Sequence, residues 1–426
     1  MDKISDRDIL DMRKYGESVS GPIVYAFVEW ILYEARRKGI RRLWFLARDG
    51  YLPYLIATKM CAHFRLDIDC RYLYCSRRSL RTASYHIVSD EELSSQLFVY
   101  GYHVTVSSLL ARLELDKDVE NAIISGLDIP LDKPLSRDEF SRLCSKLSQD
   151  KGLFFMLRAR SLERYRSAVA YFEDVGLLDE NDVCIVDSGW TGSMQRSFRI
   201  LLDSLGYRGK ICGFYFGMYR TPLPCDGEYF TYCFSAREGL FRRAFFNNNL
   251  FECMLSAPHP MTEKYAFIND VSRPCFRDVR DYNMHLMVLS QIDGALSCAE
   301  NKILENTTKT LAENKKRKIF RSVIRASIMP ARREAELFSR FLFSDDVTEK
   351  YMHSLADKNM RDLLRSYAVL PRLLRRIRRT SHGREELLWP YGTAAFLPPY
   401  LRAWYGINLL LWDLARAVRQ SIFGGE

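Results

Sequence analysis

The sequence lacks the features that mark exported, membrane-spanning and zinc-binding proteins. No stretch approaches the roughly 18 uninterrupted apolar residues of a membrane span, and residues 1–8 carry too many charges for a secretory signal. The 11 cysteines are scattered singly, without Cys-x-x-Cys pairs, and several stand in apolar runs, where reduced thiols pack as small hydrophobic groups. These absences predict a cytoplasmic protein in a reducing compartment, with no structural zinc.

The composition indicates a globular chain with an acidic partner. With 426 residues, 47% of them hydrophobic, the chain is long enough for two or three domains and can fill at least one large core. The formal net charge of +10 and the pI near 9.0 suit a nucleic acid, an anionic membrane surface or a polyphosphate substrate. Charge alone does not choose among these partners.

Apolar runs of strand length alternate with helical periodicity in the first half of the chain. Residues 43–47 and 183–186 are continuous apolar runs, and each is followed by a polar loop and then by a helical segment. Residues 71–75 and 211–218 are expected to form further strands, and residues 23–38 an amphipathic helix. Buried strands that alternate with helices predict an α/β fold with a parallel, doubly wound sheet.

The remaining segments are expected to be helical. Residues 84–178 alternate helical segments with polar turns and are expected to form a helical insertion in a core of residues 1–265. Residues 266–426 are expected to form a basic helical C-terminal region, with basic runs at 315–318 and 372–379. The segment 389–422 mixes Trp, Tyr, Leu and Pro with arginines, so it fits both a helix in a membrane interface and an ordinary packed helix.

The loop after the apolar run 183–186 has the residues of a phosphate site. Ligands of open parallel sheets gather beyond the carboxyl ends of the strands, where backbone N–H groups and helix N-termini are exposed. Thr191, Gly192 and Ser193 offer backbone donors and two hydroxyls to a phosphate, and Asp187 can accept hydrogen bonds from ribose hydroxyls. The same residues also fit a plain strand-to-helix turn with Thr and Ser as caps.

Two further loops combine charge with a strand end. Arg48, Asp49 and Gly50 bring a cation, a carboxylate and a glycine to one turn; a diphosphate needs positive charge and Mg²⁺, and the carboxylate could hold a water on that ion. A surface turn with a local ion pair is the alternative. The third loop presents adjacent guanidinium groups, suited to bidentate phosphate contacts but also common on solvated faces, in the run Ser76-Arg77-Arg78.

The segment 183–193 resembles the fingerprint with which type I phosphoribosyltransferases bind 5-phosphoribosyl diphosphate (PRPP). That fingerprint is a hydrophobic strand, an acidic position and a Thr-Gly-Ser/Thr phosphate loop, matched here by residues 183–186, Asp187 and Thr191-Gly192-Ser193. Two adjacent acids are usual in the family, whereas Ser188 follows the acid here. Residues 43–51 resemble the first strand and diphosphate loop of the same fold.

A wider resemblance covers most of the chain. Tyr15-Gly16, Gly21-Pro22, Phe27, Trp30 and the segments 45–51, 74–78 and 186–193 together resemble the phosphoribosyltransferase module of bacterial polysaccharide assembly. In that family the module is often fused behind a phosphatase of the haloacid dehalogenase type. The resemblance implies transfer of 5-phosphoribose from PRPP to a sugar hydroxyl of a lipid-linked polysaccharide (O-antigen or capsule), with inversion to a β-ribofuranosyl linkage and release of diphosphate.

The resemblance also implies the cofactor, the partners and the residues of the site. Mg²⁺ is expected at Asp49, through water, and the glycan acceptor implies a cytoplasmic protein peripheral to the inner membrane face. The sequence begins directly at the transferase module and shows no convincing DxDx[TV] motif, so a separate phosphatase partner is implied. The residues expected to bind PRPP are Arg48, Asp49, Gly50, Ser76, Arg77, Arg78, Asp187, Ser188, Gly189, Thr191, Gly192 and Ser193.

The acceptor side is expected in a second patch that resembles the family, residues 246–253 with Ser256-Ala257-Pro258-His259. Glu252 or His259 could take the proton of the acceptor hydroxyl. His259, after Pro258, equally fits a capping or core histidine. Together with Asp187 and Asp49, these two residues complete the expected catalytic set.

Two other functions remain open at this point. A haloacid dehalogenase-like phosphohydrolase is suggested by the strand that leads into Asp187, but it would need a second Asp at the position of Gly189. A non-enzymatic, basic nucleic-acid-binding protein fits the charge, but the sequence shows no recognition motif, and its aromatic residues mostly stand in apolar runs. We therefore expect no nucleic-acid partner.

Overall fold

The computed structural model describes residues 4–100, 104–127, 129–179, 181–222, 227–278, 282–305, 313–343, 353–357 and 387–423. Its strands are β1 (Arg42–Leu46), β2 (Asp69–Leu73), β3 (Val183–Trp190), β4 (Ile211–Met218), β5 (Glu228–Phe234), β6 (Thr262–Ile268), β7 (Val271–Phe276), β8 (Leu342–Phe343) and β9 (His353–Ser354). The first helices are α1 (Asp6–Tyr15), the π-helical turn η1 (Gly16–Ser20), α2 (Gly21–Arg37), α3 (Tyr51–Phe64), α4 (Arg77–Ser84), α5 (Asp90–Leu97), α6 (Val106–Leu113), α7 (Lys117–Ser125), α8 (Arg137–Ser148) and α9 (Lys151–Asp174). The later helices are α10 (Ser193–Ser204), α11 (Leu240–Phe245), α12 (Asn248–Met254), α13 (Tyr282–Glu305), α14 (Glu313–Ile328), α15 (Arg332–Phe338), α18 (Pro390–Ala394) and α19 (Pro399–Phe423).

A five-stranded parallel sheet forms the centre of the fold, with the strand order β2-β1-β3-β4-β5. The α/β class and the parallel sheet predicted from the sequence are confirmed. The chain moves outward from β1 to β2 on one side and from β3 to β5 on the other, so the winding direction reverses between β1 and β3. In open sheets of this kind, the crevice beyond the carboxyl ends at the reversal is the usual ligand site.

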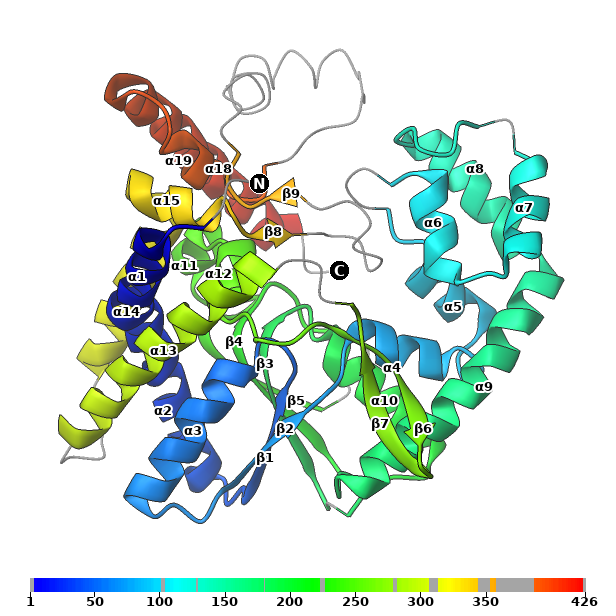
Figure 1. The fold of residues 1–426 in the computed structure, drawn as a ribbon, viewed down its shortest axis with the longest axis horizontal. Coiled ribbons are helices and arrows are strands. Elements are labelled where there is room, and N and C mark those ends of the chain that lie inside the picture. Colours follow the sequence, from blue (N-terminus) through cyan, green and yellow to red (C-terminus); the bar gives the residue numbers. More distant parts are fainter. Residues whose placement is uncertain are drawn as a thin grey trace.

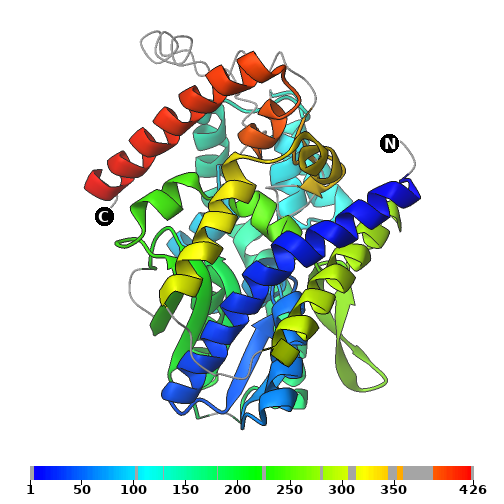
Figure 2. The same cartoon turned by 90° about the vertical axis from the view of Figure 1, so that its left-hand side faces the viewer.

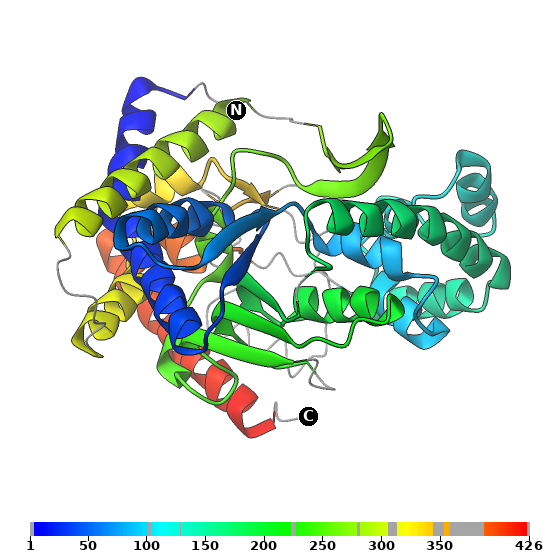
Figure 3. The same cartoon turned by 90° about the horizontal axis from the view of Figure 1, so that it is seen from below.

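Helices cover both faces of the sheet (Figures 1 and 3). Alternate residues of β1 point to opposite faces: Leu43 and Phe45 pack in the core with α2 and α3, whereas Trp44 and Leu46 pack in the core with α4, α9 and α10. Aromatic contacts fix α2 on its face, where Phe27 meets the Phe216 ring at 5.3 Å between centroids. The three central strands, β1, β3 and β4, are therefore buried on both sides over most of their length, which explains their continuous apolar runs.

A helical arm with its own core extends from one side of the sheet (Figure 1). The helices α5, α6 and α8 and the first half of α9 enclose a separate apolar cluster that includes Leu93, Leu109, Leu143 and Phe154. No strand occurs between residues 85 and 179 in the part of the chain that the structure describes. Helices thus occupy the segment for which the sequence predicted a helical insertion.

The boundary predicted at residue 265 does not separate two cores. It falls inside β6, whose antiparallel hairpin with β7 packs on α9 through stacked rings of Tyr265 and Tyr171, 4.7 Å apart. The C-terminal helices share one apolar cluster with α1, α2 and α3, and Tyr15 of α1 contacts Phe338 of α15 at 4.9 Å. α1 thus lies against α13 and α15, which come from the C-terminal half of the sequence (Figure 2). The predicted basic run 372–379 lies outside the described residues.

Two further findings concern the membrane and the cysteines. Among the described residues, no helix is both long and apolar enough to cross a membrane.

Cys184 of β3 and Cys212 of β4, which are partners in the parallel register, form a disulfide. The expectation that all cysteines are reduced is wrong for this pair, because the sequence spacing gave no sign that the two strands lie side by side.

Candidate functional site

The two loops predicted to bind one donor lie side by side at the carboxyl ends of neighbouring strands. β1 and β3 are paired in parallel, with Phe45 opposite Val186, so the loops that follow them share one edge of the sheet. The hydroxyl of Ser188 donates a hydrogen bond to Oδ2 of Asp49 and joins the two segments. The structure therefore brings together the two halves of the predicted site.

The second segment differs from the predicted loop, because β3 continues to Trp190 instead of ending at Val186. Asp187 and Ser188 are thus strand residues, and the turn itself is short, from Thr191 to Gly192, before α10 begins at Ser193. The last residues of β3 still contact the core, since Ser188 is buried and Trp190 packs against the main apolar cluster.

The first loop is a tight turn held by the backbone. The N–H of Gly50 donates to the carbonyl of Leu46 at 2.8 Å, and the N–H of Tyr51 donates to Arg48 at 3.0 Å. The peptide bond between Ala47 and Arg48 is cis. The Arg48 side chain is exposed and Asp49 is partly buried. The turn therefore places a cation and a carboxylate at the open end of β1.

Three carboxyl groups form a cluster at this edge, in which the charge of Asp49 acts on Asp187 and on Glu252. Burial, and then the charge of Asp49, raise the pKa of Asp187 to about 7. The same two causes raise the pKa of Glu252 to about 8. Burial also raises the pKa of Asp49, against the hydrogen bond from Ser188 and the charges of Arg48 and Arg77. Without a bound cation, the cluster therefore retains protons near neutral pH.

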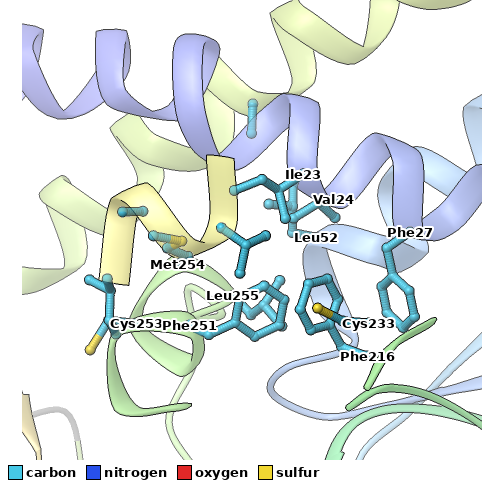
Figure 4. Packing of buried hydrophobic residues seen from close by; sticks show 14 of the residues in the cluster. Ile23, Val24, Phe27, Leu52, Phe216, Cys233, Phe251, Cys253, Met254 and Leu255 are labelled. Carbon is cyan, nitrogen blue, oxygen red and sulfur yellow. The ribbon is translucent and has the colours of Figure 1, made fainter. Parts of the chain in front are cut away.

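Glu252 reaches this cluster because α12 is anchored in the core on its other side. Figure 4 shows Phe251 and Leu255, which flank it, packed with side chains of α2, β4 and β5. The Phe251 ring lies 4.0 Å from that of Phe216. The indole N–H of Trp190 donates to Oε1 of Glu252 at 2.6 Å and fixes the carboxylate against the end of β3.

The asparagines next to Glu252 have a structural role. The Asn247 side chain accepts the N–H of Leu250 as the cap of α12. The amide groups of Asn247 and Asn249 both donate to the carbonyl of Leu388, at 2.9 and 3.2 Å. These side chains tie α12 to the C-terminal region. From the segment 246–253 that was predicted to face the acceptor, Glu252 is the residue placed at the carboxyl cluster.

The three residues predicted to bind PRPP in the loop after β2, Ser76, Arg77 and Arg78, have different surroundings. The charge of Arg77, whose side chain is exposed, lowers the pKa of Asp49, Asp187 and Glu252, so Arg77 lies near the carboxyl cluster. Arg78 instead forms an ion pair with Glu114 of the helical arm at 2.5 Å. Ser76 is buried, caps α4 through Ser79 and donates to the carbonyl of Thr262 at 2.6 Å. Its hydroxyl is thus used within the protein.

His259 lies beside the site, in a cluster of rings. Its Nδ1 lies 2.9 Å from the Pro260 carbonyl, which can only accept, so Nδ1 carries the proton and Nε2 accepts from the Tyr72 hydroxyl at 2.6 Å. Burial and the charge of Arg48 lower the pKa of His259. Both ring nitrogens are thus engaged within the protein. The rings around His259 are Tyr51, Tyr72, Tyr74 and Phe276.

The turn from Thr191 to Ser193 presents the N-terminus of α10. Gly192 is the first capping residue, with φ of 65°, and it makes no side-chain cap hydrogen bond. The first N–H groups of a helix lack partners inside the helix and attract anions. The Thr191 and Ser193 side chains are partly exposed at this turn. The sequence prediction that this turn binds a phosphate becomes part of the proposed function.

Gly189 cannot carry a side chain, which gives a first testable prediction. Its φ is 111°, and an added Cβ would lie 2.4 Å from the backbone oxygen of Gly217. We expect Gly189→Ala to destabilise the protein by about 3 kcal/mol or more, from backbone strain and steric overlap. Urea denaturation measures this loss.

Gly206→Ala is the matched control, because Gly206 has a φ of 75° but an added Cβ would meet nothing within 4 Å. The control is expected to cost about 1 kcal/mol, from the backbone alone. Equal losses in the two variants would show that the close approach of β3 to β4 is not as described.

No protein-family model matches this chain, and no curated protein does. The site therefore has to be judged from its own geometry. Sequence reasoning missed Trp190 and Tyr72, which position Glu252 and His259. Both are aromatic residues at strand ends, and only the tertiary structure distinguishes them from ordinary core residues. Among the described residues, no group of three or more His, Cys, Asp or Glu has the arrangement of a metal site.

Proposed function

We propose that this protein is a phosphoribosyltransferase of the type I class, which moves 5-phosphoribose from PRPP to a sugar hydroxyl of a lipid-linked polysaccharide. One observation carries the proposal. The turn that contains Asp49 contacts the end of β3 at Ser188, next to Asp187, at the point where the strand order reverses between β1 and β3. One turn offers charges for a diphosphate, and the other offers a helix N-terminus for a 5-phosphate. The sequence resemblance supplies the donor and the acceptor class.

The proposed donor bridges the two turns. The backbone and hydroxyls of Thr191, Gly192 and Ser193 hold the 5-phosphate at the N-terminus of α10. The Asp187 carboxylate accepts hydrogen bonds from the ribose hydroxyls, and Arg48 and Arg77 face the diphosphate. Holding both ends of the donor fixes the anomeric carbon between the turns, which removes most of the orientational cost of the reaction.

In the proposed reaction, the bond between the anomeric carbon and the diphosphate oxygen breaks as the acceptor oxygen attacks from the opposite face. The developing charge on the diphosphate is stabilised by Arg48 and Arg77. The hydroxyl proton of the acceptor passes to Glu252, whose raised pKa suits a base that works near neutral pH. The products are a β-linked phosphoribosyl glycan and free diphosphate.

The residues fit Mg²⁺ that is held mainly by the donor. Mg²⁺ commonly binds through one or two carboxylates together with substrate phosphates and several waters, without a cage of protein ligands. Asp49, which Ser188 holds in place and which lies in a cluster of raised carboxyl pKa values, is suited to that contact through a water. The ion would neutralise charge on the leaving diphosphate.

A pair of neighbouring arginines gives a second testable prediction. Arg77→Ala is expected to raise KM for PRPP by roughly 10- to 100-fold, because a charged contact to the diphosphate is lost. Arg78→Ala is the matched control and should leave KM unchanged, since Arg78 pairs with Glu114. Steady-state kinetics with varied PRPP separates the two. A larger KM effect from Arg78→Ala would contradict the assignment of these side chains.

The transferase proposal is tested by incubating the full chain with PRPP, Mg²⁺ and a panel of lipid-linked glycans. Mass spectrometry should find a phosphopentose on one glycan, with one diphosphate released per transfer. PRPP hydrolysis that no glycan stimulates would contradict the acceptor half of the proposal. No consumption of PRPP with any glycan would contradict the proposal as a whole.

The hydrolase alternative is weakened by the same geometry. A haloacid dehalogenase-type site needs a second acid two residues after Asp187, and that position is Gly189, where a side chain would collide with the backbone of β4. The carboxyl pair that this chemistry requires cannot be formed there. A phosphatase partner remains part of the proposal, because the proposed product keeps its 5-phosphate.

A further inference from the structure

An apolar stripe lies on the outward face of the last described helix, α19. Its members, which we call the α19 stripe, are Tyr400, Trp404, Ile407, Leu411 and Val418. Their exposed fractions lie between 40% and 73%, although they recur every three, four or seven residues, the spacing of one helix face. Large apolar side chains at this spacing normally face a core. Here the core side of α19 is formed by other residues, Tyr405, Leu409 and Ala417, which are buried.

The charged residues of α19 lie to the sides of the stripe and toward the protein. Asp413 accepts from the Tyr391 hydroxyl at 3.0 Å and pairs with Arg416 at 2.5 Å. Arg402 donates to the carbonyl of Pro330. Arg416 lies on the side of α19 that faces the protein, where its charge acts on the buried Tyr219 and on Tyr391. Arg419 is exposed. The stripe contains no acidic residue, because Asp413 is the one acidic residue of α19 and contacts Tyr391.

We propose that the α19 stripe is a docking surface for an anionic lipid bilayer, on which α19 lies in the plane of the interface. Tyr, Trp, Ile and Leu on one helix face without an acidic residue fit an interfacial helix. The net charge of +10 favours the anionic surface as well.

The neighbourhood of the stripe supports this occupant. Met329, which is exposed, and Arg332 flank Pro330, the residue that Arg402 of α19 contacts, so apolar and basic groups continue beyond the helix. α19 lies at the end of the molecule toward which the parallel strands run (Figures 1 and 2). A bilayer on the stripe would therefore lie at the same end of the molecule as the carboxyl cluster.

The electrostatics agree with that proximity. Burial, and more weakly the charges of Glu252 and Asp413, raise the pKa of Tyr219, while Arg416 lowers it. The pKa of Tyr219 is thus affected both by a residue of the carboxyl cluster and by residues of α19. If the proposed function holds, a lipid-linked acceptor anchored in the bilayer would present its sugar from the side on which the site opens.

Vesicle binding tests the docking surface without any substrate. The full chain is mixed with vesicles of phosphatidylcholine, or of phosphatidylcholine with phosphatidylglycerol, and bound protein is measured by sedimentation. We expect binding to the anionic vesicles, weakened by salt, and little binding to the neutral ones. The triple variant Trp404→Gln, Ile407→Gln, Leu411→Gln should bind at least about tenfold more weakly, because three apolar side chains no longer enter the interface.

The matched control replaces three exposed apolar residues elsewhere, Leu10→Gln, Phe155→Gln and Leu304→Gln, and should bind like the unchanged protein. Circular dichroism checks that both triple variants are folded. Three outcomes would overturn the proposal: no binding of the unchanged protein to anionic vesicles, equal loss in both triple variants, or a dimer in solution that the stripe variant alone converts to monomer. None of these outcomes depends on PRPP, so phosphoribosyl transfer is tested separately.

Discussion

Asp187→Asn is expected to lower the rate of phosphoribosyl transfer by about 10³-fold or more, while the fold is kept. In the proposed complex, the Asp187 carboxylate accepts hydrogen bonds from the ribose hydroxyls and supports the positive charge that develops on the ring. An amide of the same shape keeps the packing but carries no negative charge. Release of diphosphate in the presence of acceptor, with circular dichroism as the check on folding, measures the effect.

The same substitution is expected to stabilise the protein in the absence of ligands. Burial and Asp49 raise the pKa of Asp187 to about 7 in the folded state, above the ordinary value of an unfolded chain. The folded state therefore binds the proton more tightly, and stability falls as pH rises from the ordinary value through about 7. At pH 8 the asparagine variant should be more stable by about 1–3 kcal/mol.

Asp67→Asn is the control for both effects, because Asp67 is an exposed carboxyl that precedes β2, at the opposite end of the strand from the site. It should change neither the transfer rate nor the melting temperature. An Asp187→Asn variant that is folded and fully active would remove Asp187 from the site. A variant that is inactive and less stable at pH 8 would show that the carboxylate is not held in the strained, partly buried cluster described.

Glu252→Gln is expected to lower kcat by roughly 10²- to 10⁴-fold, the usual contribution of a positioned general base. The unchanged enzyme should show kcat/KM that rises with pH through about 8, because Glu252 accepts a proton only when it is ionised and its pKa is about 8 in the free protein. In Glu252→Gln the part of the rise near pH 8 should disappear, whereas the part that follows ionisation of Asp187, with its pKa of about 7, should remain. The hydrogen bond from Trp190 can still be made to the amide oxygen, so the position of α12 is kept.

His259→Gln distinguishes the two candidate bases. The pKa of His259 is lowered, and both its ring nitrogens have partners, so the variant should keep the pH-dependent rise and most of the activity. The reverse result, with the rise lost in His259→Gln and retained in Glu252→Gln, would assign the base to the histidine.

The sheet and the adjacency of its loops followed from the sequence because they depend on local patterns. Continuous apolar runs such as 43–47 and 183–186 predict buried parallel strands. The carboxyl ends of parallel strands lie at the same edge of the sheet. The strand β5 and the hairpin of β6 and β7 were not predicted. These strands are only partly buried and lie at an edge of the main sheet or outside it, where the apolar signal is weak.

The finer composition of the site depended on contacts that no local pattern contains. Glu252 lies about 60 residues after Trp190 along the chain, and it reaches the carboxyl cluster because Phe251 and Leu255 bury the opposite side of α12. Arg77 and Arg78 are chemically equivalent in sequence. Arg78 is directed away by Glu114, a residue of the helical arm. Long-range packing thus separates a proposed substrate contact from a structural ion pair.

Amide hydrogen exchange tests most directly whether one PRPP molecule binds to both turns at once. Exchange would be followed in peptides covering residues 47–56 and 187–198, with Mg²⁺ and either PRPP, diphosphate or ribose 5-phosphate. The account predicts that PRPP slows exchange in both peptides, whereas diphosphate slows mainly the first and ribose 5-phosphate mainly the second. Protection by PRPP that is absent, or confined to one of the two peptides, would contradict it.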